Sequence, residues 1–222
     1  KVWVHYSNQP EALDSYGIFN RYQKVQFNNV ISGQIAPREE NAKAKTNFVL
    51  GYFGRVSPIK NIEFLLELIA ELPEEVCLEI HGSRTDEKYN RRLEDIVSSL
   101  QISSRVKFCG SYNRITFAEQ LSRVDLVVIS SISESFCHVF FEAIENRKLV
   151  LASTGLPWAA ANNKVAETIL PLEIDLWKRR IQKIIKYDRQ TYTTQQDKLV
   201  EYYNEVFLAT NRDTLEGLKE IL

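Results

Sequence analysis

The stretch that decides the fold class of this chain reads Ser130-Ser131-Ile132-Ser133-Glu134-Ser135-Phe136-Cys137-His138-Val139-Phe140-Phe141-Glu142-Ala143-Ile144. It follows residues 125–129, a short apolar run with β-branched side chains that is typical of a buried strand. From Phe136 onward, apolar residues recur at helical spacing. The sequence therefore predicts a strand, a serine-rich turn and a helix, with Ser135 as the N-cap of that helix.

Two carboxylates, Glu134 and Glu142, flank the predicted start of the helix. If residues 135–142 are helical, a rise of ~1.5 Å per residue separates the two by about 10–12 Å. That is roughly the distance between the sugar and ribose hydroxyls of a nucleotide sugar. The helix N-terminus between them offers unpaired N–H groups and partial positive charge, which suit a diphosphate. With 26% charged residues such a pair also arises by chance, so the surrounding motifs must decide whether it marks a binding site or an exposed helix start.

Strands and helices alternate from residue 48 onward. The predicted strands cover residues 48–53, 76–80, 106–109, 125–129 and 149–152. Helical apolar spacing follows the first four of them, and Pro73 ends the first helix. This alternation predicts an α/β fold, a doubly wound, Rossmann-like parallel sheet covered on both faces. Ligands bind such sheets at the carboxyl ends of the strands, where the motifs of this chain fall.

The composition predicts three parts. Residues 1–46 are the tail of a preceding domain followed by a linker, residues 47–190 form the domain of alternating strands and helices, and residues 191–222 form a helical C-terminal part. The tail has strand-like runs near residues 2–6 and 24–27, and the helical end predicts helices over residues 195–208 and 214–222. Trp177 is expected to be a core anchor because of its large apolar area.

Bulk composition narrows the class of protein. The 44% hydrophobic content fits an ordinary soluble domain, and 28 basic residues against 29 acidic ones argue against binding nucleic acid through bulk charge. No apolar run approaches the ~18–20 residues of a membrane span, and no signal peptide is visible. The chain begins with Lys1 and contains no Met, so we expect it to be a fragment of a longer protein.

The three cysteines, Cys77, Cys109 and Cys137, each lie in or beside a predicted strand or helix start. Their spacing is not that of metal ligands, and we expect buried free thiols in a reducing compartment. The expected location is therefore cytoplasmic, and no metal site is predicted.

A second motif, Gly54-Arg55-Val56-Ser57-Pro58-Ile59-Lys60-Asn61, ends the first strand of the alternating domain and runs into a helix. The forked guanidinium of Arg55 and the ammonium of Lys60 suit a diphosphate, and Ser57 or Asn61 could cap the helix. A surface loop would also carry such residues. Here they share the strand-end edge with Glu134 and Glu142, which favours a binding site.

Together these two motifs resemble the nucleotide-sugar domain of glycosyltransferase family 4. The resemblance rests on the Gly-Arg-Val and Lys-Asn turn, followed about 75 residues later by Glu134 and, eight residues on, Glu142. It covers roughly residues 47–190 and implies the GT-B fold, in which two doubly wound domains face each other across a cleft. The chain would be the C-terminal half, and residues 1–46 the end of the acceptor-side domain.

The resemblance also implies residue roles. Arg55, Lys60 and Glu134 would be the catalytic residues: the two cations would bind the donor diphosphate, and Glu134 would hold hydroxyls of the transferred sugar. Glu142 would bind the ribose hydroxyls. Further donor contacts are implied for Gly82, Ser111, Ser135, Phe136, Cys137, His138 and Val139. The implied reaction transfers a sugar from a UDP- or GDP-linked donor with retention of configuration, without a cofactor or bound metal.

Two positions depart from the family pattern. Cys137 stands where the family usually has Gly, and His138 where it usually has an aliphatic residue. The thiol could narrow the donor pocket or weaken activity. For His138, a capping or phosphate-facing role is favoured over that of a general base.

The expected acceptor is a glycan or a lipid-linked glycan, bound by an N-terminal domain that the chain largely lacks. This chain alone should therefore bind donor without transferring sugar. A peripheral contact of the full protein with a membrane stays open. The alternatives are a non-catalytic nucleotide-sugar-binding domain and a GT-B-type epimerase or phosphorylase. A flavodoxin-like signalling domain is disfavoured because Arg55 stands where an acidic cluster is expected. The phosphate-binding glycine fingerprints of dinucleotide-binding and P-loop proteins are both absent.

Overall fold

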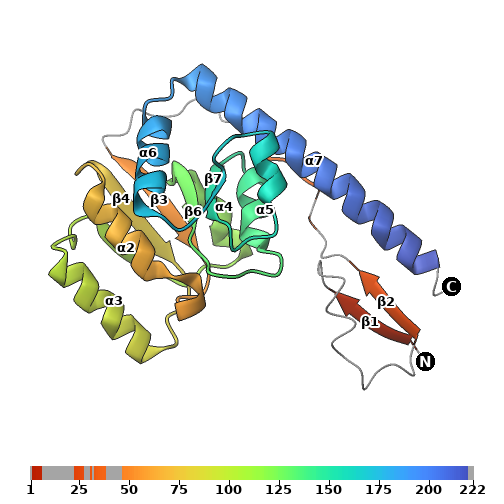
Figure 1. Ribbon diagram of the computed structural model, residues 1–222, viewed down its shortest axis with the longest axis horizontal. Helices are drawn as coiled ribbons and strands as arrows, with labels where there is room; N and C mark the ends of the chain where they lie inside the picture. Colours follow the sequence, from red (N-terminus) through yellow and green to blue (C-terminus); the bar gives the residue numbers. More distant parts are fainter. Residues whose placement is uncertain (1, 7–22, 28–30, 32, 39–46, 220–222) are drawn as a thin grey trace.

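The computed structural model describes residues 2–6, 23–27, 31, 33–38 and 47–219. Within these residues no helix combines the length and the apolar character needed to cross a membrane. Most of the described chain forms one α/β domain, and the long C-terminal helix extends from it toward a separate pair of short strands (Figure 1).

The domain is built on a six-stranded, wholly parallel sheet. Its strands, in spatial order, are β5 (Val106–Gly110), β4 (Val76–His81), β3 (Phe48–Phe53), β6 (Leu126–Ile129), β7 (Leu149–Ser153) and β8 (Ile169–Leu170). The chain starts at the centre with β3, winds outward through β4 and β5, then returns to β6 and winds outward the other way. This order is that of a doubly wound sheet, which confirms the predicted fold class.

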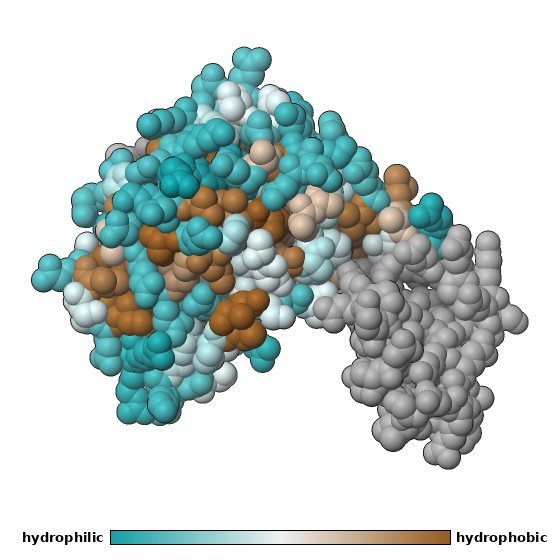
Figure 2. All heavy atoms as spheres, in the orientation of Figure 1, coloured by the Kyte–Doolittle hydropathy of each residue, from teal (hydrophilic) through white to brown (hydrophobic). Residues whose placement is uncertain are grey.

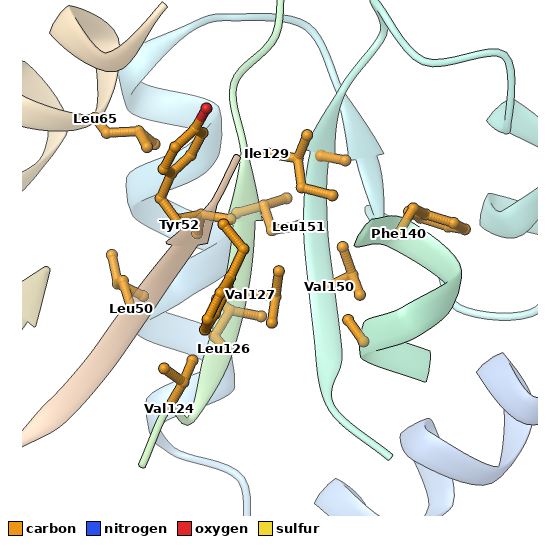
Figure 3. Close-up of a cluster of buried hydrophobic side chains, with 14 of the residues drawn as sticks. Leu50, Tyr52, Leu65, Val124, Leu126, Val127, Ile129, Phe140, Val150 and Leu151 are labelled. Carbon is orange, nitrogen blue, oxygen red and sulfur yellow. The ribbon is translucent and has the colours of Figure 1, made fainter. Parts of the chain in front are cut away.

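Helices cover both faces of the sheet, because strand side chains alternate between faces. Tyr52 of β3 lies beside Leu65 of α2 (Ile62–Glu71) in the buried cluster of Figure 3. Its neighbour Gly51 faces the opposite way, and a Cβ there would come within 2.5 Å of Val124, just after α4 (Arg114–Ser122). Helices α2 and α4 therefore lie on opposite faces.

The remaining helices complete two layers. Helices α3 (Glu87–Ser99) and α6 (Ile174–Ile185) pack against α2, whereas α5 (His138–Glu145) packs against β7 and α7 (Arg189–Lys219). The predicted core anchor Trp177 is fully buried in α6, packs edge-on against Phe64, and donates its indole N–H to the Pro171 carbonyl at 2.8 Å. The face drawn in Figure 2 is mostly hydrophilic at its outline, with apolar residues gathered toward its middle.

A long helix ties distant parts of the chain together. Tyr192 of α7 donates its hydroxyl to the Asp125 carbonyl at 2.5 Å, at the start of β6. Further along α7, the hydroxyl of Tyr203 donates to Glu145 at 2.6 Å and accepts from the Gly33 amide at 2.7 Å. Helix α7 therefore braces both the sheet domain and the segment that leads into it.

All five strands predicted for the sheet are confirmed, and so are the two N-terminal runs, which form a parallel pair, β1 (Val2–Tyr6) and β2 (Gln23–Phe27). Most of the predicted linker lies outside the described residues. The two helices predicted over 195–208 and 214–222 are wrong as separate elements, because α7 is continuous through Lys219. The two-residue strand β8 and the short 3-10 helices Pro58–Lys60 and Ala159–Asn163 were not predicted.

Candidate functional site

A cleft of about 420 Å³ opens at the carboxyl ends of β3 and β6. These two strands are neighbours at the sheet centre, where the chain changes its direction of winding, and such a switch point is where doubly wound sheets bind ligands. The cleft is lined by Tyr52, Phe53, Gly54, Arg55, Lys60, Ile129, Ser131, Glu134, Ser135, Phe136, Cys137, His138 and Val139. Both motifs singled out in the sequence therefore meet at this cleft.

Two loops are joined at the cleft by hydrogen bonds. The Ser130 hydroxyl donates to the carbonyls of Lys60 and Asn61 at 2.9 and 3.0 Å, and the Ile132 amide donates to Ile59 at 2.8 Å. These bonds hold the loop after β3 against the loop after β6. Asn61 occupies the N-cap position of α2 in a left-handed conformation, and neither it nor Ser57 makes a side-chain capping bond.

Lys60 and Glu134 form an ion pair inside the cleft. Their side chains are only 18% and 12% exposed, and the Ser131 hydroxyl donates to the same carboxylate oxygen at 2.7 Å. A diphosphate that uses Lys60 must therefore compete with Glu134 for the ammonium group. Arg55 lines the cleft and is exposed.

Helix α5 begins at His138, with Cys137 at the N-cap, so the prediction that Ser135 is the N-cap is wrong. Cys137 has φ 67° and ψ 75°, in the left-handed region that ordinarily favours glycine. Because residues 135–137 are not helical, the helical separation calculated for Glu134 and Glu142 does not apply. The N-terminus of α5 still lies at the cleft, and the unpaired backbone amides of a helix N-terminus favour anions.

The thiol of Cys137 lies in this cleft and remains protonated at neutral pH. Burial, with a contribution from the Glu134 carboxylate, raises the pKa of the Cys137 thiol to about 12. The three cysteines are free, as predicted, but they are half-buried rather than fully buried. His138 is exposed and its ring lies 4.6 Å from that of Phe136. The Phe136 carbonyl accepts a hydrogen bond from the indole N–H of Trp158.

Glu142 does not line the cleft but lies toward Tyr112. Burial, followed by the Glu142 carboxylate, raises the pKa of Tyr112 to about 12. The Tyr112 ring packs edge-on against Phe53, a cleft residue, with centroids 5.5 Å apart. Tyr112 thus lies near the Glu142 carboxylate and also contacts a residue of the cleft lining.

Gly82 has a packing role. A Cβ at this position would lie 1.7 Å from the Gly54 carbonyl oxygen, so only glycine lets the ends of β3 and β4 approach this closely. Its amide donates to the Gly110 carbonyl at 2.8 Å. Neither Gly82 nor the exposed Ser111 lines the cleft, and their implied donor contacts stay predictions.

Sequence reasoning missed several cleft residues, among them Tyr52, Phe53, Ile129 and Ser131. Tyr52 donates its hydroxyl to the Arg55 carbonyl at 2.7 Å and so shapes the turn that carries Arg55. Burial keeps the pKa of this phenol well above its usual range. Their position at strand ends could have indicated Tyr52 and Phe53, because side chains at those ends face the ligand edge.

Fold and cleft together define a class, that of doubly wound α/β domains with a cleft at the switch point of the sheet. The match to known families is more specific. The family model described as "Glycosyl transferases group 1" matches residues 6–204, and the chain belongs to that family.

Curated relatives include the D-inositol 3-phosphate glycosyltransferases of Mycobacterium ulcerans and Mycobacteroides abscessus. The first is 29% identical over 141 residues, which cover 62% of this chain and 30% of the relative. The second is 28% identical over 155 residues, or 68% of this chain and 34% of the relative. The chain thus spans about a third of the length of these relatives.

Solved structures of similar fold include Anabaena Alr3699/HepE in complex with UDP and glucose. It has a TM-score of 0.76 at 20% identity, with 97% of this chain and 71% of that chain covered. Sucrose-phosphate synthase from Thermosynechococcus elongatus has a TM-score of 0.77 at 22% identity, with 99% and 58% covered. These likenesses agree with the GT-B domain expected from the sequence.

Proposed function

We propose that this chain is the donor-binding part of a retaining glycosyltransferase. It would bind a nucleotide-diphosphate sugar, and the whole enzyme would transfer the sugar to a glycan or lipid-linked acceptor. The observation that carries the proposal is the joining of Arg55, Lys60, Glu134 and the N-terminus of α5 in one cleft at the switch point.

The cleft offers a chemically consistent set of contacts for such a donor. Arg55, Lys60 and the first amides of α5 would hold the diphosphate. Glu134 would exchange its bond with Lys60 for hydroxyls of the transferred sugar. As the sugar leaves, negative charge grows on the diphosphate, and the two cations would stabilise that charge increasingly toward the transition state.

The nucleoside would extend along the aromatic side of the cleft, over Phe53 and Tyr112, toward Glu142. Because Tyr112 lies near the Glu142 carboxylate, a ribose there would lie within reach of that acid. The HepE structure with UDP-glucose, whose chain is 72% covered by this one at a TM-score of 0.76, supports a nucleotide sugar as the ligand class.

A second candidate is a domain that binds the donor without catalysis. The left-handed Cys137, in a position where the resembled family usually has Gly, favours this alternative because its side chain occupies space beside the helix N-terminus. Sugar transfer by the full-length enzyme that is lost in Glu134→Gln would exclude it. We expect the present chain to bind donor but not to transfer sugar, since it spans only about a third of its relatives.

The test is a titration of the chain with UDP, GDP, ADP and their common sugars, followed by thermal unfolding and calorimetry. Ligand at 100 times its dissociation constant should add about 2.7 kcal/mol of stability, or about 5–10 °C in this size range. Arg55→Ala and Glu142→Ala should reduce the shift. Arg91→Ala, in the exposed outer face of α3, is the matched control and should not. No binding of any of these ligands by calorimetry would contradict the proposal.

A further inference from the structure

A second cluster of chemically active side chains lies outside the cleft, on the β4–β5 edge of the sheet. Glu79 and His81 are two residues apart on β4 and so share a face, and Cys109 comes from the neighbouring strand β5. One potential ligand atom from each of the three lies within 4.8 Å of the others. The cysteine spacing could not predict this group, because its members come from two strands.

The His81 ring is fixed in place by its neighbours. It is 2% exposed and stacks on Phe53 with centroids 4.5 Å apart and planes 5° apart. Its Nε2 lies 3.1 Å from Glu79 Oε2, whereas Nδ1 is buried and has no hydrogen-bond partner among the residues that the structure describes. Nε2 is therefore the ring nitrogen that faces Glu79, and a neutral imidazole can offer the lone pair of that nitrogen to a metal ion.

We propose that Glu79, His81 and Cys109 bind Zn²⁺ or a similar thiophilic divalent ion. Carboxylate oxygen, imidazole nitrogen and thiolate sulfur are the ligands that zinc takes in proteins, and three of them with one water make a recognised site. Bonds of about 2.0–2.3 Å in a tetrahedron hold ligand atoms about 3.3–3.7 Å apart. The present atoms, within 4.8 Å of one another, therefore need to move by only about 1 Å.

Lys107 is the neighbour that opposes a cation at this site. Its ammonium lies 3.8 Å from Glu79 Oε1, and it occupies the register position opposite Glu79 on β5. The Lys107 side chain is 68% exposed, so it can turn into solvent when a divalent ion takes over the carboxylate. Removing this ammonium should therefore tighten metal binding.

The site would also reach the cleft. Phe53 stacks on His81 and also lines the cleft. An ion that holds the His81 ring would hold Phe53 with it. This inference does not depend on the function proposed for the cleft.

The experiment titrates the chelator-treated chain with Co²⁺ and with Zn²⁺. Cobalt should give one equivalent of binding with a sulfur-to-cobalt charge-transfer band in the near ultraviolet. Zinc affinity is measured by competition with a chromophoric chelator. Cys109→Ser should abolish the band and weaken zinc by more than about 100-fold, because even losing an outer-shell partner costs about 10–100-fold.

Two matched variants complete the test. Cys77→Ser changes a half-buried cysteine on β4 that is not in the cluster, and it should leave the band and the zinc affinity unchanged. Lys107→Ala should strengthen zinc binding. Circular dichroism and thermal unfolding check that each variant is folded. A missing cobalt band in the unmodified chain, a band that survives Cys109→Ser, or one that is lost in Cys77→Ser would overturn the proposal.

Discussion

Lys60 and Glu134 show how one residue pair can serve both structure and binding. Each neutralises the other in a mostly buried place, and Ser131 adds a hydrogen bond to the carboxylate. A buried charge left without its partner is costly, so the pair must exchange partners rather than simply break when a ligand enters.

Glu134→Gln should therefore bind UDP more tightly while lowering stability. The amide no longer competes for the Lys60 ammonium, so we expect nucleotide affinity to rise by about 3–10-fold. A change of this size corresponds to a fraction of the free energy of one charge-assisted hydrogen bond. The free energy of unfolding should fall by about 1–3 kcal/mol because Lys60 loses its counter-charge. Calorimetry and urea unfolding measure the two effects, and Lys60→Met should give weaker UDP binding instead.

Cys137 carries a backbone conformation that its side chain disfavours. At φ 67° a residue with a Cβ costs roughly 1–2 kcal/mol relative to glycine. We expect Cys137→Gly to be about 1 kcal/mol more stable than Cys137→Ala, since both lose the thiol but only glycine relieves the strain. Chemical denaturation of the two variants decides this. Equal stabilities, or a more stable alanine variant, would contradict it.

At the scale of elements, the order of strands and helices was predictable and their exact junctions were not. Apolar alternation and Pro73 placed the five strands and the end of α2 correctly. The start of α5 was missed because the helical apolar spacing extends back to Phe136, whereas the left-handed Cys137 ends the turn later. The break predicted between residues 208 and 214 was wrong, because α7 continues without interruption through this polar stretch.

The residues of the candidate site were predictable only where they lie near one another in the sequence. Arg55, Lys60 and the stretch from Glu134 to Val139 could be predicted because they lie next to strand ends in sequence. The role of Gly82 could not, because it depends on a carbonyl from a different strand. The Glu79, His81 and Cys109 cluster was likewise missed, since the pairing of β4 with β5 brings its members together.

Arg105 links the turn after α2 to the start of β5. Its buried guanidinium donates to the carbonyls of Val76, Leu72 and Pro73 at 2.9–3.0 Å. Arg105→Met should remove all three hydrogen bonds, with only the Pro73 carbonyl keeping a bond from the Val76 amide, and lower the free energy of unfolding by about 3 kcal/mol. Urea unfolding measures the loss. Arg91→Met, which removes an exposed guanidinium from α3, should change stability by less than about 0.5 kcal/mol.

At the scale of the whole molecule, α7 joins parts of the chain that are far apart in sequence. Through Tyr203 it contacts both Gly33 and Glu145, and through Asp197 it forms ion pairs with Arg147 and Arg38. Because the helix crosses the domain and continues toward β1 and β2, its packing fixes how the N-terminal segment approaches the sheet (Figure 1).

Tyr203→Phe tests this bracing helix. The ring stays buried, but the Gly33 amide and the Glu145 carboxylate each lose a partner. We expect a loss of about 1–3 kcal/mol and faster hydrogen exchange at the Gly33 amide. Tyr192→Phe, which removes a bond at the other end of α7, should leave exchange at Gly33 unchanged. Unchanged exchange in Tyr203→Phe would contradict the bracing role.

The central position of β3 has a consequence for synthesis on the ribosome. The Val49 amide bonds to the side chain of Asp125, 76 residues later in the chain, and β3 pairs with β6 from Leu50 onward. At a translation rate of about 5–20 residues per second, this edge of β3 stays unpaired for roughly 4–15 s until β6 has been synthesised. During that time an unpaired apolar edge is open to neighbouring chains, so slower translation before residue 126 should increase aggregation and chaperone dependence.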